Sequence, residues 1–385
     1  MQYSPSRLFS TILVILLLSA CGKSEDMVSA HSISDPMADL GNSEEVRTER
    51  ARASVNLIAD SVKSGDMASA RAIFDAMADL GDSEEILTRR ANVSVNLINV
   101  YGESGDIVSA HAIFDTMAGL GDTEAIRTRR AMASINLINS YGQKGDMVSA
   151  HAIFDAMADL GDSEDIRNLR AKASFNLINA YGQKGDMVSA RTLFDAMADL
   201  GDSEDIRTER ANVSVNLINV YDKSGDIVSA RSIFDAMADL GNSEGIRTRH
   251  AMASINLINA YAQKDDMVSA RAIFDAMTGL GDSEKIRTWR AKASFNLIDA
   301  YGQKGDIVSA HAIFDAMADL GDSEEIRTVR AKAAANLSLA HCCAGQEAKA
   351  REMLALIPSL DAGKEGKQIE RVAAKMLARG CPPQE

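Results

Sequence analysis

Residues 91–130 read ANVSVNLINVYGESGDIVSAHAIFDTMAGLGDTEAIRTRR, and the chain repeats this phrase with small changes every 40 residues. The copies begin at Ala51, Ala91, Ala131, Ala171, Ala211, Ala251 and Ala291, and Ala331 begins a more divergent copy. A fixed period of this length is typical of repeat proteins, in which each unit packs only against its neighbours. The 385 residues are therefore expected to form one elongated array.

Each unit predicts two helices. Asp82 stands three residues before Glu85, a spacing typical of a capping box at a helix start. No Gly or Pro follows until after Tyr101, and Gly105 then suits the left-handed position just past a helix end. Asp106 can cap the second helix. Apolar residues recur in that second helix at intervals of three and four, as expected for one buried stripe: Ile107, Ala110, Ile113, Phe114 and Met117.

Neither helix can bury its apolar stripe alone, so the units are expected to stack into an all-α superhelix. The predicted segments are a signal peptide over residues 1–20, a lipid-attachment segment with a half-repeat over 21–50, seven tandem helical-hairpin repeats over 51–330, and a degenerate repeat with a capping helix over 331–385. Residues 91–210 also resemble 211–330 unit for unit, which indicates that a block of three repeats was duplicated.

The N-terminus carries an export pattern. Arg7 precedes an apolar run from Ile12 to Leu18 that is too short to span a bilayer and is typical of a signal peptide. The run ends in Leu-Ser-Ala before Cys21, which resembles the lipobox of bacterial lipoproteins. That resemblance implies lipid attachment at Cys21 and a place in the cell envelope, at the outer membrane facing the periplasm in a Gram-negative cell. The alternative is an ordinary signal peptide or membrane anchor that ends in Cys.

The phrase NLINVYGESGDIVSAHAIFDTM, residues 96–117, resembles the tetratricopeptide and pentatricopeptide repeats. The shared positions are Leu97, Tyr101, Gly105, Ala110 and Phe114. The resemblance covers most of the chain from residue 22 to about 357. It implies an all-α, right-handed superhelical solenoid of stacked two-helix repeats.

Asparagines recur along one face of the first helix, where positions 92, 96, 99 and 103 are three or four residues apart. The two columns are Asn56, Asn96, Asn136, Asn176, Asn216, Asn256, Asn296 and Asn336, and Asn99, Asn139, Asn179, Asn219 and Asn259. In tetratricopeptide solenoids such amides line a concave groove and bond the backbone of an extended peptide, which an amide can do whatever the peptide's sequence. The columns therefore predict a peptide-binding groove. The alternative is that these amides join helices inside the scaffold.

Pentatricopeptide proteins read single-stranded RNA through a polar side chain two residues before the Leu of the first helix. Here that column is apolar: Val95, Ile135, Phe175, Val215, Ile255 and Phe295. An apolar side chain offers no hydrogen bond to a base edge, and a net charge of −14 disfavours a phosphate backbone. The Arg-rich phrases are expected to form ion pairs, as Glu85 stands four residues before Arg89. Nucleic acid is therefore predicted to be an unlikely partner.

Almost every polar residue recurs from unit to unit, whereas an enzyme needs one unique constellation. The four cysteines fit no disulfide framework or zinc motif. We therefore expect no catalysis, no cofactor, no metal and no small-molecule substrate. The sequence predicts a protein-interaction scaffold at the bacterial cell envelope, held to the membrane by its N-terminal lipid and binding extended peptide or protein segments. The alternative is a pentatricopeptide-like protein that binds single-stranded RNA.

Overall fold

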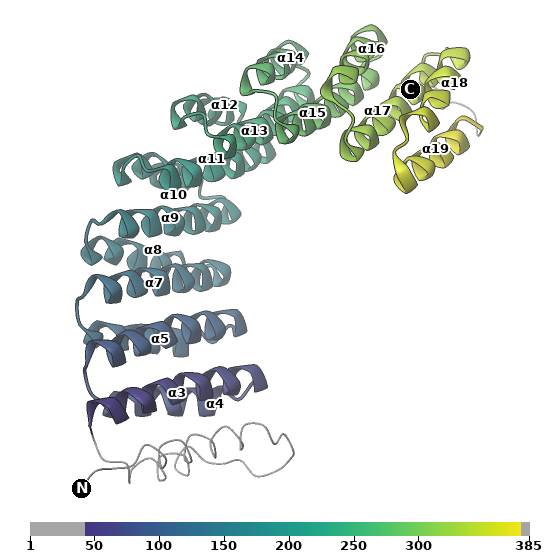
Figure 1. Ribbon diagram of the computed structural model, residues 1–385. Coiled ribbons are helices and arrows are strands. Elements are labelled where there is room, and N and C mark those ends of the chain that lie inside the picture. Colours follow the sequence, from purple (N-terminus) through teal and green to yellow (C-terminus); the bar gives the residue numbers. More distant parts are fainter. Residues whose placement is uncertain (1–42, 379–385) are drawn as a thin grey trace, which may run out of the picture.

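The computed structural model describes residues 43–378 (Figure 1). Over these residues the protein consists of helices without strands, arranged in regular repeats, which confirms the predicted all-α solenoid. The predicted signal peptide and Cys21 lie outside the described residues, so export and lipid attachment remain predictions. Within the described part, no helix combines the length and the apolar character that a bilayer crossing requires.

Each repeat contains a long first helix and a shorter second helix. The first helices are α3 (Glu44–Ser64), α5 (Glu84–Ser104), α7 (Glu124–Lys144), α9 (Glu164–Lys184), α11 (Glu204–Ser224), α13 (Glu244–Gln263), α15 (Glu284–Gln303) and α17 (Glu324–Cys343). The second helices are α4 (Met67–Ala76), α6 (Ile107–Thr116), α8 (Met147–Ala156), α10 (Met187–Ala196), α12 (Ile227–Ala236), α14 (Met267–Ala276), α16 (Ile307–Ala316) and α18 (Glu347–Leu356). One helix, α19 (Gly363–Ala378), follows α18.

A single 3-10 turn follows each second helix. These turns are η1 (Met77–Leu80), η2 (Met117–Leu120), η3 (Met157–Leu160), η4 (Met197–Leu200), η5 (Met237–Leu240), η6 (Met277–Leu280), η7 (Met317–Leu320) and η8 (Pro358–Leu360). The sequence had placed Met117 in the second helix, whereas α6 ends at Thr116 and the 3-10 turn begins at Met117. The change of helix type is explained by Met117 and Leu120, which are both buried. Residues three apart share one side of a 3-10 helix, so the tighter turn points both side chains into the core.

The helix caps explain where each element begins and ends. The first helix of the unit at 91 starts after Ser83, one residue later than the capping box at Asp82 had predicted. In the next units the same position acts as a true cap, since the Ser163 hydroxyl accepts a bond from the amide of Ile166 at 3.4 Å. Gly105 ends the first helix with a φ of 82°, as expected. The Asp106 carboxylate then accepts the amide of Ser109 at 3.1 Å and starts the second helix.

The core runs continuously between the repeats. Leu97 and Ile98 of α5 are fully buried, and burial of such a side chain contributes about 1.5 to 3 kcal/mol. Small residues let neighbouring first helices approach closely. A Cβ at Gly102 would lie 2.1 Å from the hydroxyl of Ser140, so a larger residue at this crossing would require the Ser140 side chain to move.

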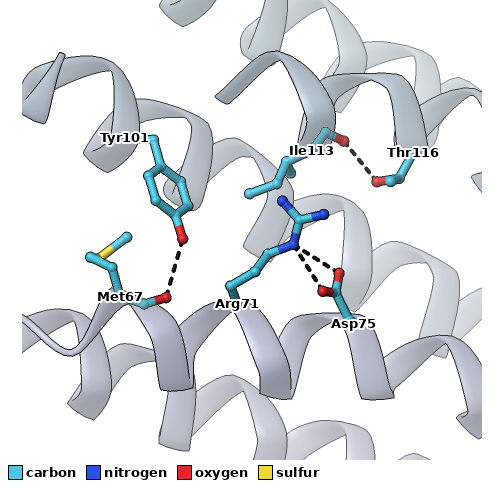
Figure 2. A network of polar contacts seen from close by, with 6 residues as sticks. All are labelled: Met67, Arg71, Asp75, Tyr101, Ile113 and Thr116. Atoms are coloured by element: carbon cyan, nitrogen blue, oxygen red, sulfur yellow. Dashed lines mark hydrogen bonds and ion pairs between the residues drawn. The ribbon is translucent and has the colours of Figure 1, made fainter. Parts of the chain in front are cut away.

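Polar contacts also join each second helix to the next first helix. The Tyr101 hydroxyl donates to the carbonyl of Met67 at 3.1 Å, and Figure 2 shows this bond beside the ion pair of Arg71 with Asp75. Figure 1 shows the first helices stacked side by side, with the array changing direction near α9 to α11. The repeat therefore presents the same side of every first helix along one continuous, bent surface.

Candidate nucleic-acid interface

We define the first-helix face as the positions equivalent to residues 92, 95, 96, 99 and 103 in α3 to α17. Each of these positions lies three or four residues from another one, so they lie together on one side of each helix. Asn92, Asn96 and Asn99 are exposed in α5. The face is thus open to a ligand and repeats from helix to helix.

The first asparagine column joins neighbouring first helices. Asn136 donates its side-chain amide to the carbonyl of Val95 at 3.3 Å, and Asn256 repeats this bond to Val215 at 3.4 Å. At other junctions an asparagine of the first column donates to a residue of the second column on the preceding helix, as Asn216 does to the side-chain oxygen of Asn179 at 3.0 Å. The bonds of this second kind also include Asn296 to Asn259 at 2.9 Å and Asn336 to Asp299 at 3.0 Å.

These bonds leave part of each amide unused. An asparagine offers two N–H donors and one acceptor oxygen, and each bond to a neighbouring helix uses only one donor of the first column. Asn56, Asn96, Asn99 and Asn139 are exposed, whereas the remaining asparagines of both columns are half-buried: Asn136, Asn176, Asn179, Asn216, Asn219, Asn256, Asn259, Asn296 and Asn336. The amides hold helices together, and their contact with a ligand remains a prediction.

Amides from adjacent helices also meet around small polar hollows. One hollow of about 150 Å³ lies between α7 and α9, and its amide-bearing residues are Asn139, Gln143, Asn176, Asn179 and Gln183. A site with this lining presents many donors and acceptors within a small space. It can therefore hold a polar group of varied shape.

The apolar column lies beside the asparagines. Val95, Ile135, Phe175, Val215 and Phe295 are half-buried against the core, and Ile255 is buried. None of them offers a hydrogen bond to a base edge. The rings of Phe175 and Phe295 nevertheless provide partly accessible aromatic surface on the face.

Cations outnumber acidic residues on the first-helix face. The cations are Arg52, Lys63, Lys172, Lys223, Lys292 and Lys332, and the acidic residues are Glu103 and Asp299. Lys292 lies 4.4 Å from the ring centre of Trp289 and forms an ion pair of 2.7 Å with Glu325. Burial raises the pKa of Asp299, which weakens the negative charge on this face at low pH.

Most of the acidic residues that give the chain its charge of −14 lie off this face, although Glu49, Asp60, Glu325 and Glu365 form ion pairs with its cations. Glu84 and its equivalents start the first helices, and Asp115 lies on a second helix. Asp106 caps a second helix, where hydrogen bonds from Ser109 hold the pKa of its carboxyl below the usual value. Charges farther apart than about 8 Å are largely screened at physiological salt. The cations of the face that form no ion pair in the described structure, Lys172 and Lys223, are therefore the ones available to a phosphate bound there.

The Arg-rich phrases behave as predicted in part of the chain. Arg89 forms an ion pair with Glu85 at 2.6 Å. Arg129 donates instead to the side chain of Asn92 in the preceding repeat, and Arg249 does the same to Asn212 at 2.8 Å. The described residues contain no group of three or more His, Cys, Asp or Glu side chains that could hold a metal ion.

The sequence interpretation missed the lysines of the first-helix face. It had identified the position of Asn92 on this face but had not followed that column through the other repeats, where it contains Lys172, Lys292 and Lys332. The residues at one position in every repeat show the charge of a single face, which the net charge of the whole chain does not. The interpretation also missed a pocket between α17 and α19, which depends on how these two helices pack.

The pentatricopeptide repeat family model matches five segments of this chain, residues 95–122, 136–162, 176–202, 256–282 and 296–322. A search of curated protein sequences finds no match. Among solved structures, the pentatricopeptide repeat protein PPR10 in complex with an 18-nt psaJ RNA element is 14% identical, with 82% of this chain and 46% of that chain covered and a TM-score of 0.31. PPR10 from maize is also 14% identical, with 86% and 62% covered and a TM-score of 0.26. The chain thus spans about half the length of the first of these structures.

The family match corrects two expectations. The peptide-binding function followed from the tetratricopeptide side of the resemblance, whereas the matching family model is the pentatricopeptide one. The exclusion of nucleic acid, which rested on the net charge and on the apolar column, was also wrong, because the matching family model is that of the pentatricopeptide repeat. Repeat architecture and family model agree, and this chain is a helical repeat protein in which five segments match the pentatricopeptide repeat.

Proposed function

We propose that this protein binds single-stranded RNA along its first-helix face, without catalysis. The observation that carries the proposal is the match of five segments to the pentatricopeptide repeat model. The resemblance to pentatricopeptide proteins implies single-stranded RNA as the ligand. The chemistry of the first-helix face supports RNA binding. Along the array, this face combines cations, amides and half-buried apolar side chains. Each class suits a different part of a nucleotide.

The cations suit the phosphates. Lys172 and Lys223 lie on adjacent first-helix faces, α9 and α11, and neither forms an ion pair in the described structure. Their ammonium groups are therefore available to neutralise phosphate charge. Because this neutralisation releases counterions, affinity should fall as the salt concentration rises.

The apolar column and the amides suit the bases. Phe175 and Phe295 provide aromatic surface on which any base can stack, and stacking tolerates different sequences. A hydrogen-bonding residue is missing from the column through which pentatricopeptide proteins read bases. We therefore propose binding with little sequence preference, and a preference for single strands, whose bases are free to reach the face.

A fluorescently labelled, unstructured 20-nucleotide RNA tests the proposal by anisotropy at several salt concentrations, with a duplex of the same length alongside. The Lys172→Ala/Lys223→Ala variant should weaken binding and lower the slope of log affinity against log salt by about 0.7 for each cation removed. The matched control is Arg191→Ala/Arg231→Ala, which removes two cations on second helices α10 and α12 that are paired with Asp195 and Asp235.

The control variant should bind like the unchanged protein. Absence of RNA binding at low salt would refute the proposal. Equal losses in both variants would place the RNA away from the first-helix face.

A further inference from the structure

A pocket of about 710 Å³ lies between α17 and α19, at the C-terminal part of the first-helix face. Helix α19 packs against α17 at the place where earlier repeats have another first helix (Figure 1). Phe295 of α15 and Lys332 and Asn336 of α17 line the pocket, and all three belong to the first-helix face. The pocket therefore opens onto the same surface as the proposed RNA site.

A sequence change explains why the space is open. The apolar column has Val, Ile or Phe in the earlier repeats, but Ala335 takes this position in α17. Leu339 stands where the other repeats from α5 onward have Asn or Asp. Ala335 fills less space than the Val, Ile or Phe of the earlier repeats, and Phe295, Leu339 and Ile369 give the pocket an apolar wall.

The rim of the pocket is polar and carries positive charge. Lys332 forms an ion pair of 2.6 Å with Glu365, whereas Lys364 is exposed and has no ion pair in the described structure. Asn336 uses one donor on Asp299 and keeps its oxygen and second donor free. Gln368 adds a further amide from α19.

These features fit one nucleotide. An aromatic wall accepts a base by stacking, amides can bond its edge, and an unpaired lysine can neutralise a phosphate. The volume falls within the range of roughly 300 to 1,000 Å³ typical of small-molecule sites. We propose that this pocket binds a single nucleotide, with the base against Phe295 and the phosphate at Lys364. The inference rests on the proposed RNA binding, which would supply such a nucleotide as part of a bound strand.

Adenosine 5′-monophosphate is the probe, titrated calorimetrically into the full chain. Lys364→Ala should weaken its binding at least fivefold without changing the melting temperature, because Lys364 is exposed. Ala335→Phe should abolish binding, since it restores the bulk that the earlier repeats have at this position. Phe295→Ala should weaken binding by removing the stacking surface, and its melting temperature identifies any part of the loss that comes from unfolding.

The labelled 20-nucleotide RNA separates this inference from the proposed function. If RNA binds while the mononucleotide does not, the pocket assignment is wrong and the proposed function stands. Mononucleotide binding that is lost in Ala335→Phe, in a protein that binds no RNA, would support the pocket as a site for free nucleotides and reject the RNA proposal. Mononucleotide binding that survives in both Ala335→Phe and Lys364→Ala would place the probe elsewhere and overturn the inference.

Discussion

His341 of α17 lies with its Nε2 atom 2.6 Å from the Nε2 atom of His311 in α16. Earlier junctions have tyrosine at this position, and there Tyr141 and Tyr181 bond His111 and His151 at 2.8 and 2.9 Å. The other ring nitrogen of His341 lies 2.8 Å from Oε1 of Gln346, an atom that only accepts hydrogen bonds. The Nδ1 atom of His341 therefore carries a proton, and its neutral Nε2 accepts from His311.

The first prediction concerns the pH dependence of stability. Burial lowers the pKa of His341, with the charges of His311 and Lys349 acting in the same direction and Gln346 and Glu352 opposing it. The folded state then binds fewer protons than the unfolded state, so stability is lost as the pH falls from about 6.5 through the folded pKa. The melting temperature should therefore be lower at pH 5 than at pH 8.

The matched variant His341→Tyr restores the residue of the earlier repeats and should reduce this pH dependence. His250 should account for the pH dependence of stability that remains in this variant, because burial lowers the pKa of His250 as well. His250→Arg, which restores the arginine of most other repeats at this position, should remove that part. An unchanged pH profile in the double variant would show that the two histidines do not control it.

The second prediction concerns the bonds between neighbouring first helices. Asn136→Ala removes the bond to the carbonyl of Val95 and should lower the free energy of unfolding by about 0.5 to 1.5 kcal/mol. Asn96→Ala is the control, because Asn96 is exposed and makes no such bond. Chemical denaturation of both variants measures the difference. Equal stabilities would mean that the bond between α5 and α7 contributes nothing.

Most of the fold could be predicted because it depends on local signals repeated in every unit. The turn at Gly105 and Asp106 needs only a residue that tolerates positive φ and a side chain that caps a helix. The 3-10 turn at Met117 could not be predicted in the same way, because it depends on which side chains the neighbouring repeat buries. The first helix begins after Ser83 rather than after the predicted Asp82, and helix boundaries read from a sequence pattern commonly differ by one or two residues.

The candidate site was harder to predict because it depends on contacts between repeats. The sequence identified the asparagine columns but could not decide whether Asn216 faces a ligand or Asn179, since both fit the same helical spacing. The net charge of −14 led to the prediction that nucleic acid is an unlikely partner, although the first-helix face carries lysines. The pocket beside Ala335 depends on the place that α19 takes, and no residue pattern in α17 specifies it.

The third prediction concerns the independence of the repeats. Deleting residues 91–210 joins Arg90 to Ala211, and the sequence after the junction begins with the same ANVSVNL as the sequence removed. Tyr221 then takes the position of Tyr101 opposite Met67. The shorter protein should be as helical per residue as the parent and should unfold cooperatively, with lower stability because fewer interfaces remain. Circular dichroism during denaturation checks this, and a molten product would contradict independent stacking.

The last prediction tests why binding should tolerate different sequences. Val215 lies half-buried in the apolar column of α11, where it can contact a base but cannot bond its edge. Val215→Asn supplies a donor and an acceptor at that point, and one net hydrogen bond is worth about 0.5 to 1.5 kcal/mol. The variant should therefore prefer one base over the others by roughly two- to tenfold in oligomers of U, C and A, whereas the parent protein should bind them alike.

Val215→Ile is the control, because isoleucine occupies this position at Ile135 and Ile255 and adds no hydrogen-bonding group. It should leave the base preference flat. Melting temperatures identify any loss of affinity that comes from unfolding, since an asparagine that finds no partner at a half-buried site is itself destabilising. If Val215→Asn weakened binding to all three oligomers equally while the fold remained stable, this column would not lie against the bases. RNA would then have to contact the array through its amides and lysines alone.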